Sequence, residues 1–75
     1  MDDADRAWTG VTREQFIRAV EELPADSRAV FELRAFGQAY GQIAAQLQIS
    51  HEAVAARLRL ARALLRDALV GAVQA

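Results

Sequence analysis

The sequence predicts an all-α domain of four helices, the last two of which form a helix-turn-helix. Apolar residues recur every three or four positions in four separate stretches, which is the spacing of one face of a helix. Pro24 and Gly37 lie between these stretches, where a helix has to end. A three-residue turn separates the last two stretches, which is typical of a helix-turn-helix. Nothing in the pattern indicates a strand, an internal repeat or an interdomain linker.

The first helix is predicted over residues 12–22. Thr12 and Gln15 have the spacing of a capping box, in which each side chain bonds the other residue's backbone N–H. Pro24 ends the helix, because the residue before a proline avoids the helical region. We therefore expect residues 1–11 to form a flexible N-terminal segment and residues 12–75 to form the domain. The core-facing residues of this helix are Phe16, Val20 and Leu23.

The second helix is predicted over residues 25–36. Pro24 suits the start of this helix, since its fixed φ is already helical. Gly37 is a natural C-terminal stop because glycine adopts the left-handed conformation easily. The side chains expected to turn inward are Val30, Phe31 and Leu33.

The third and fourth helices are predicted over residues 40–47 and 51–69, with the turn at 48–50. Ser50 is a suitable N-cap for the fourth helix. Ala44 is small enough for the two helices to cross closely there. Gln48 occupies a position that often needs a left-handed backbone, which costs about 1 kcal/mol more for glutamine than for glycine. The side chains predicted to fill the space between the two helices are Ile43, Leu47, Ile49 and Val54.

A helical wheel divides the surface of the fourth helix into three parts. Arg59, Arg62 and Arg66 lie together on one flank of the core-facing stripe. Leu60 and Leu64 form a second apolar ridge on the other flank, beside Ala53 and Arg57. This ridge has to contact the first helix, contact a partner or stay exposed. The core-facing stripe itself consists of Val54, Leu58, Ala61, Leu65 and Leu69.

Composition excludes several classes of protein. The chain has 75 residues, no cysteine and 53% apolar residues, so disulfides and thiolate metal sites cannot stabilise it. No apolar run is long enough to span a membrane, and the acidic N-terminus is unlike a secretory signal, so we expect a cytoplasmic protein. The net charge is −1, but it is unevenly distributed. Residues 1–36 hold eight acids and five arginines, whereas residues 37–75 hold two acids and four arginines.

The order and spacing of residues over about 16–69 resemble a known family. The run "LPADSRAVFELRAFGQAYGQIAAQLQISHEAVAARLRLARALLRDAL" is similar to region 4 of bacterial RNA polymerase sigma factors, and most similar to the extracytoplasmic-function (ECF) group. The matching positions include Leu23-Pro24, Tyr40, Ile43-Ala44, Ile49-Ser50 and Arg57-Leu58. Each is a weak motif alone, but together they are fairly specific.

The resemblance implies a sigma region 4-like domain that recognises the promoter −35 element in the major groove of double-stranded DNA. It also implies docking on the flap of the RNA polymerase β subunit and, often, capture by an anti-sigma protein. By position, the recognition helix begins at Ser50, His51 and Glu52. Tyr40 and Gln42 correspond to residues near the DNA backbone, and the arginines implied to contact bases or phosphates are Arg57, Arg59 and Arg62.

The sequence also departs from the sigma pattern. Ala53, Ala55 and Ala56 replace a threonine, a lysine and a serine, and Leu60 replaces a residue that is commonly basic. The spacing from Val30 to Gly37 is closer to that of LuxR-type output domains, but the ending "ARLRLARALLRDAL" follows the sigma pattern. A sigma factor also needs a region 2 to melt the promoter. The chain is therefore expected to be either an excised domain or a free-standing relative.

Each candidate site residue also has a purely structural interpretation. His51 can be an ordinary exposed residue of the first turn, and Glu52 there can complement the helix dipole. Arg57 lies at the edge of the core stripe and can pair internally with an acid. No aromatic residues alternate with the arginines, which disfavours binding of single strands, and Phe16, Phe31 and Phe36 are expected in the core or an interface.

Two functional hypotheses remain open. The first is a DNA-binding module that recognises a −35-like duplex. The second is a protein-interaction module that keeps the sigma fold, favoured by the alanines at 53, 55 and 56 and by the Leu60/Leu64 ridge. No arrangement of residues indicates an enzyme, a cofactor, a catalytic metal or a membrane-binding surface.

Overall fold

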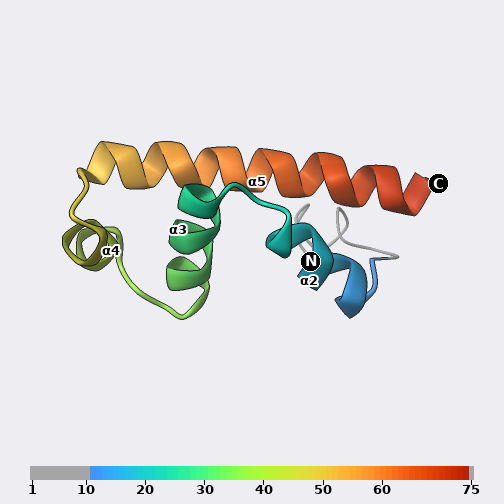
Figure 1. Ribbon diagram of the computed structural model, residues 1–75, viewed down its shortest axis with the longest axis horizontal. Coiled ribbons are helices and arrows are strands. Elements are labelled where there is room, and N and C mark those ends of the chain that lie inside the picture. The colour runs from blue at the N-terminus through green and yellow to red at the C-terminus, as the bar shows by residue number, and fades with distance from the viewer. Residues whose placement is uncertain (1–10, 75) are drawn as a thin grey trace, which may run out of the picture.

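The computed structural model describes residues 11–74, with side chains described up to Gly71, and consists there of four α-helices without strands (Figure 1). These are α2 (Arg13–Glu21), α3 (Ala25–Ala35), α4 (Tyr40–Leu47) and α5 (His51–Gln74). The all-α prediction and the helix-turn-helix are confirmed. The bounds of α4 match the predicted ones, but α5 continues beyond the predicted end at residue 69. No proline follows Leu69, and Gly71 stays helical instead of adopting the left-handed conformation that ends α3 at Gly37, so the helix continues.

The longest helix, α5, carries the core of the molecule. Figure 1 shows α2, α3 and α4 lying along one side of α5. One buried cluster joins α5 to α2, and its members are Ala19, Leu23, Ala61, Leu65 and Leu69. A second cluster joins α5 to α3 and α4, and its members are Val30, Ile43, Ala44, Val54 and Leu58. Phe31 packs against both clusters, and the core stripe predicted for α5 is confirmed in full.

The helix starts follow the predicted capping chemistry. The hydroxyl oxygen of Thr12 accepts from the backbone N–H of Gln15 at 3.1 Å, and Oε1 of Gln15 accepts from the N–H of Thr12 at 2.9 Å. At the start of α5, Oγ of Ser50 accepts from the N–H of Ala53 at 3.0 Å. These bonds satisfy donors that the first turn of a helix leaves unpaired, so both helices begin where the sequence places them.

The ends of α3 and α4 both use a left-handed residue. Gly37 has φ +93°, which only glycine adopts without strain. Gln48, at the end of α4, has φ 58° and ψ 46°, and the N–H of Ile49 donates to the carbonyl of Ala44 at 3.0 Å. The strain expected at Gln48 is therefore present, and it is the geometry that turns the chain from α4 into α5.

Replacing Gln48 with glycine should stabilise the domain by up to about 1 kcal/mol, because glycine relieves the left-handed strain. Urea denaturation followed by circular dichroism measures the change. Gln46→Gly, an exposed position inside α4, is the matched control and should destabilise by about 1 kcal/mol. Equal destabilisation by both substitutions would contradict the strain at Gln48.

Replacing Leu58 with alanine should destabilise the domain by about 2–5 kcal/mol, because it leaves a cavity in the second cluster. Leu58 is 1% exposed, whereas Leu60, two residues later on the same helix, is 48% exposed. Leu60→Ala is therefore the control, with an expected loss below about 1 kcal/mol in the same denaturation experiment at low protein concentration. A similar loss for the two variants would show that the helix face is wrongly assigned.

Candidate nucleic-acid interface

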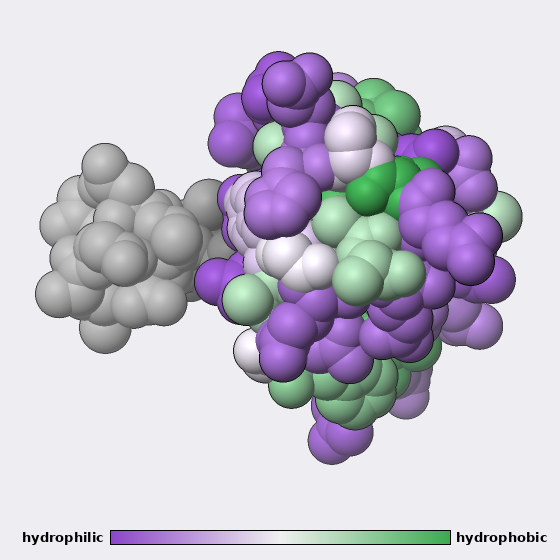
Figure 2. Space-filling model, turned by 90° about the vertical axis from the view of Figure 1, so that its left-hand side faces the viewer, coloured by the Kyte–Doolittle hydropathy of each residue, from purple (hydrophilic) through white to green (hydrophobic). Residues whose placement is uncertain are grey.

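The end of the molecule that carries α4 and the start of α5 has a mainly hydrophilic surface. Figure 2 shows this end, where hydrophilic side chains surround a smaller apolar area. The polar residues exposed along α4, the turn and the first turn of α5 are Gln42, Gln46, Gln48, Ser50, His51 and Glu52. The predicted recognition segment is therefore accessible to a ligand as large as a DNA duplex.

The first turns of α4 and α5 lie against each other at Gly41 and His51. A Cβ added at Gly41 would lie 3.4 Å from Cε1 of His51, so the imidazole ring rests beside the backbone of α4. His51 is nevertheless an exposed residue. One side of the ring thus lies against α4, and this contact holds the ring in place at the start of α5. The other side is available to a ligand.

A basic surface depression lies between the start of α4 and the flank of α5. Three of its lining residues are the arginines predicted to share one flank, and all three are exposed. Within residues 11–71 no carboxylate forms an ion pair with any of them. The depression therefore presents guanidinium groups that no carboxylate of the described residues neutralises. Its lining residues are Tyr40, Ala55, Arg59, Arg62, Ala63 and Arg66.

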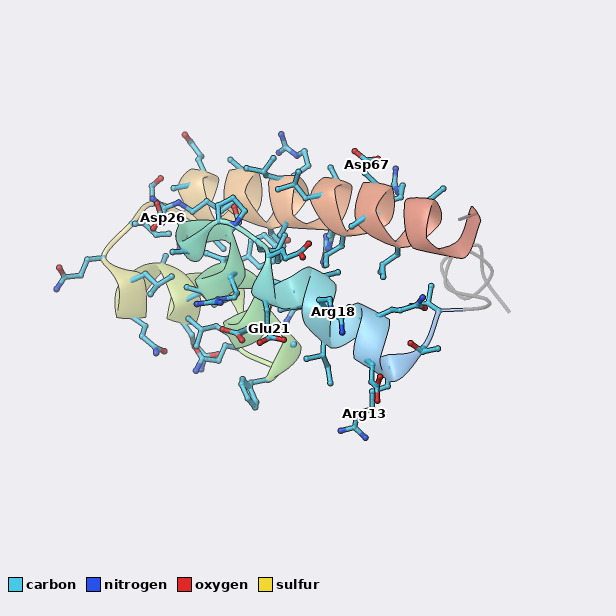
Figure 3. The ribbon with its side chains drawn as sticks, turned by 45° about the vertical axis from the view of Figure 1, so that its right-hand side comes forward. Arg13, Arg18, Glu21, Asp26 and Asp67 are labelled. Atoms are coloured by element: carbon cyan, nitrogen blue, oxygen red, sulfur yellow. The ribbon has the colours of Figure 1, made fainter. Side chains whose placement is uncertain are left out.

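Arg57 is oriented differently from these arginines. Its Nη2 lies 3.9 Å from Oδ2 of Asp26 at the start of α3, and the two side chains are 33% and 77% exposed. Figure 3 shows Asp26 at that position. The structure thus supports the internal pairing that the sequence left open for Arg57, and separates this residue from the basic depression.

Tyr40 is half-buried at the edge of the basic depression. The guanidinium carbon of Arg34 lies 5.8 Å from the centroid of the Tyr40 ring, within the range of a cation–π contact. Nη1 of Arg34 also donates to the carbonyl of Gln38 at 3.0 Å. Sequence reasoning gave Arg34 no role. The structure shows that it orients the tyrosine and braces the loop before α4.

Two of the candidate residues already have a structural task. Oε1 of Gln42 accepts from the backbone N–H of Ala39 at 2.8 Å, which caps the start of α4, and Gln42 is an exposed residue. The hydroxyl oxygen of Ser50 caps α5. Glu52 is exposed in the first turn of α5, where a negative charge complements the helix dipole. Base contacts by these groups have to coexist with those tasks.

The three alanines of the recognition helix give it a smooth surface. Ala53 and Ala55 are half-buried, and Ala56 is exposed. Methyl groups offer no hydrogen bonds to base edges, although they can contact the methyl group of thymine. The N-terminal half of α5 can therefore enter a groove, but it carries few groups that distinguish one base from another.

An apolar groove lies on a different face, between α2 and α3. Phe36 at its edge is 85% exposed and Ile17 is 47% exposed. Phe36 was expected in the core or an interface, and its exposure excludes the core, because it lies at the end of α3 outside both buried clusters. The interface alternative remains. The apolar lining residues of this groove are Phe16, Ile17, Val20, Phe31, Ala35 and Phe36.

The Leu60/Leu64 ridge stays exposed, which is one of the three outcomes that its position allowed. Leu60 is 48% exposed and Leu64 is 37% exposed, so α2 does not cover them.

Among the described residues no helix is long and apolar enough to cross a membrane. No group of three or more histidine, cysteine, aspartate or glutamate residues in the same part of the chain could hold a metal ion.

Comparison with known families assigns the chain. Residues 13–65 match the family described as sigma-70, region 4. No curated protein and no solved structure matches the chain. The family match takes in all of α2, α3 and α4, the turn, and α5 as far as the buried Leu65, which is more than half of the chain. The chain therefore belongs to the sigma-70 region 4 family.

Proposed function

We propose that this domain binds promoter DNA at a −35-like element, with the first half of α5 in the major groove, and that it docks on the flap of the RNA polymerase β subunit to direct transcription initiation in the cytoplasm. The ECF-like subtype is part of this proposal. The observation that carries it is the basic depression, in which Arg59, Arg62 and Arg66 lie beside α4 without a carboxylate partner in the described chain.

The geometry fits the way a helix-turn-helix contacts DNA. The second helix enters the major groove while the first crosses the phosphate backbone. Tyr40 and the amide of Gln42 lie at the start of α4, where they can meet a phosphate next to the depression. His51 and Glu52 occupy the exposed first turn of α5, where base edges are reached.

Phosphate contacts should dominate affinity, and base contacts should be few. Guanidinium groups position a protein on the duplex without distinguishing sequences, whereas specificity needs groups that reach base edges. Here those groups are reduced to His51, Glu52 and the arginines, because alanines occupy the neighbouring positions. We expect weak binding by the isolated domain, with specificity completed by the polymerase.

Replacing Arg59 and Arg62 together with alanine should weaken duplex binding by about tenfold or more near 50 mM salt, because two phosphate-facing charges are lost. The slope of log affinity against log salt should also become shallower by about two. Fluorescence anisotropy with labelled duplexes carrying varied −35-like sites, at two salt concentrations, measures both quantities.

The matched control is an arginine far from the basic depression. Arg18 is an exposed residue of α2, and Arg18→Ala should leave both the affinity and the salt slope unchanged. Circular dichroism confirms that the double variant is folded. An unaltered affinity in the folded double variant would exclude these contacts.

A second candidate function is a protein-interaction module with weak or no DNA binding, bound by an anti-sigma protein or the polymerase flap. The α2/α3 groove favours it, because Phe36 and Ile17 are large apolar side chains left in solvent. Exposed apolar patches of this kind commonly mark protein contacts. Protein docking at the groove is also compatible with DNA binding, since the groove and the basic depression share no lining residue.

Replacing Phe36 with serine should weaken binding of an isolated β-flap fragment by about tenfold, because an exposed aromatic anchor is removed. Calorimetric titration of the flap fragment measures the change, and DNA affinity should stay as in the parent chain. Val70→Ser, which removes a 39%-exposed apolar residue of α5 outside the groove, is the control. Equal flap affinity for the parent and Phe36→Ser would exclude the groove as the flap site.

A further inference from the structure

One flank of α5 carries a stripe that shares no residue with the basic depression or the α2/α3 groove, although its first residue, Ala53, lies in the recognition helix. Its six residues are spaced alternately four and three apart, which is the spacing of the a and d positions of a coiled coil. Leucines lie at its centre, charged residues lie outside them, and small residues lie at its two ends. The stripe consists of Ala53, Arg57, Leu60, Leu64, Asp67 and Gly71.

This stripe is exposed from Leu60 to Gly71 and half-buried at Ala53 and Arg57. The other helices lie along one side of α5, and Figure 3 shows Asp67 on the side away from them (Figures 1 and 3). Leu60 is 48% exposed, and Leu64 is 37% exposed. A Cβ added at Gly71 would meet nothing within 4 Å, so that end of the stripe faces open space.

We propose that this stripe is a self-association surface, through which the α5 helices of two copies of the chain pair side by side in antiparallel orientation. In such a pair centred at the level of Arg62, residues equally far before and after that level share a layer. Leu60 then faces Leu64 of the second copy. Arg57 faces Asp67, and Ala53 faces Gly71.

Every layer of this pairing is chemically matched. The leucines bury apolar area at the centre, and each guanidinium meets a carboxylate. The alanine and glycine at the ends let the two helices approach closely. Because a two-fold axis repeats each contact, the two copies form two leucine pairs and two ion pairs in all, one of each on either side of the centre.

The charges also select the orientation. A parallel pair in register places Arg57 against Arg57 and Asp67 against Asp67, and like charges in facing positions disfavour that arrangement. The antiparallel pair converts both repulsions into attractions. The existing contact does not prevent this, because Arg57 lies 3.9 Å from Asp26 and its guanidinium has five N–H donors, enough for two carboxylates.

The occupant is a second copy rather than a different protein because the complementarity lies within the stripe itself. An unrelated partner explains exposed leucines, but it does not explain why an arginine and an aspartate stand five residues on either side of the same level. The proposal does not rest on the DNA-binding proposal, since the exposed arginines of the basic depression, which carry the latter, are not part of the stripe.

Charge reversal with heterodimer rescue tests the pairing. Sedimentation equilibrium of the 75-residue chain, over roughly 10 µM to 1 mM, follows association from the monomer mass of 8.2 kDa towards twice that value. Arg57→Glu and Asp67→Arg should each weaken association at least tenfold, because each turns both ion pairs into repulsions. An equimolar mixture of the two variants should restore association, since it pairs the introduced glutamate with the introduced arginine and Arg57 with Asp67.

Controls separate the surface from general effects of charge and folding. Arg18→Glu makes the same change of charge on α2 and should associate like the parent chain. Circular dichroism verifies the fold of each variant, and Leu60→Ser provides a second disruption that does not alter charge.

A parent chain that stays monomeric over the whole range overturns the proposal, and the Leu60/Leu64 ridge would then be a surface for a different protein. Association that survives both charge reversals, or a mixture without rescue, also overturns it. DNA titrations are run below the association range, so either result leaves the DNA-binding test unaffected.

Discussion

The packing of three short helices against one long helix is the constraint on which the structure depends. The helices α2, α3 and α4 have 9, 11 and 8 residues, lengths at which an isolated helix is marginal in water. Each gains its stability by burying an apolar face on α5, and the two buried clusters meet through Phe31. The crossing of α4 and α5 at Ala44 and Val54 therefore sets the angle at which the start of α5 is presented. The same contacts that hold the fold also aim the recognition helix.

Local chemistry explains which parts of the fold could be predicted from the sequence. The Thr12 capping box, the Ser50 cap and the stop at Gly37 depend on residues within a few positions of one another, and all three are found. The strained turn at Gln48 was predictable because the residue that ends the first helix of a helix-turn-helix often needs a left-handed backbone, and Gln48 occupies that position. The end of α5 was placed too early, since the last core residue of a helix need not be its last residue.

Contacts between distant residues explain what the sequence left open. The pairing of Arg57 with Asp26 depends on the packing of α3 against α5, so the helical wheel could only place this arginine at an edge. The exposure of Phe36 depends on the direction in which the chain leaves α3. The contact of Arg34 with Tyr40 spans the loop between α3 and α4, and helical periodicity carries no information about it. The three arginines of the basic depression were predictable because one regular helix fixes their common flank.

The position of Ala53 in α5 has a consequence for the fraction of molecules that can bind DNA. Ala53 lies one turn into the helix that would enter DNA, and in an antiparallel pair it is covered by the far end of the second copy's α5. A pair and a DNA complex then exclude each other at that turn. Because the paired fraction rises with the total concentration of the chain, part of any added chain would form pairs. The concentration of monomer able to bind DNA would therefore rise more slowly than the total concentration.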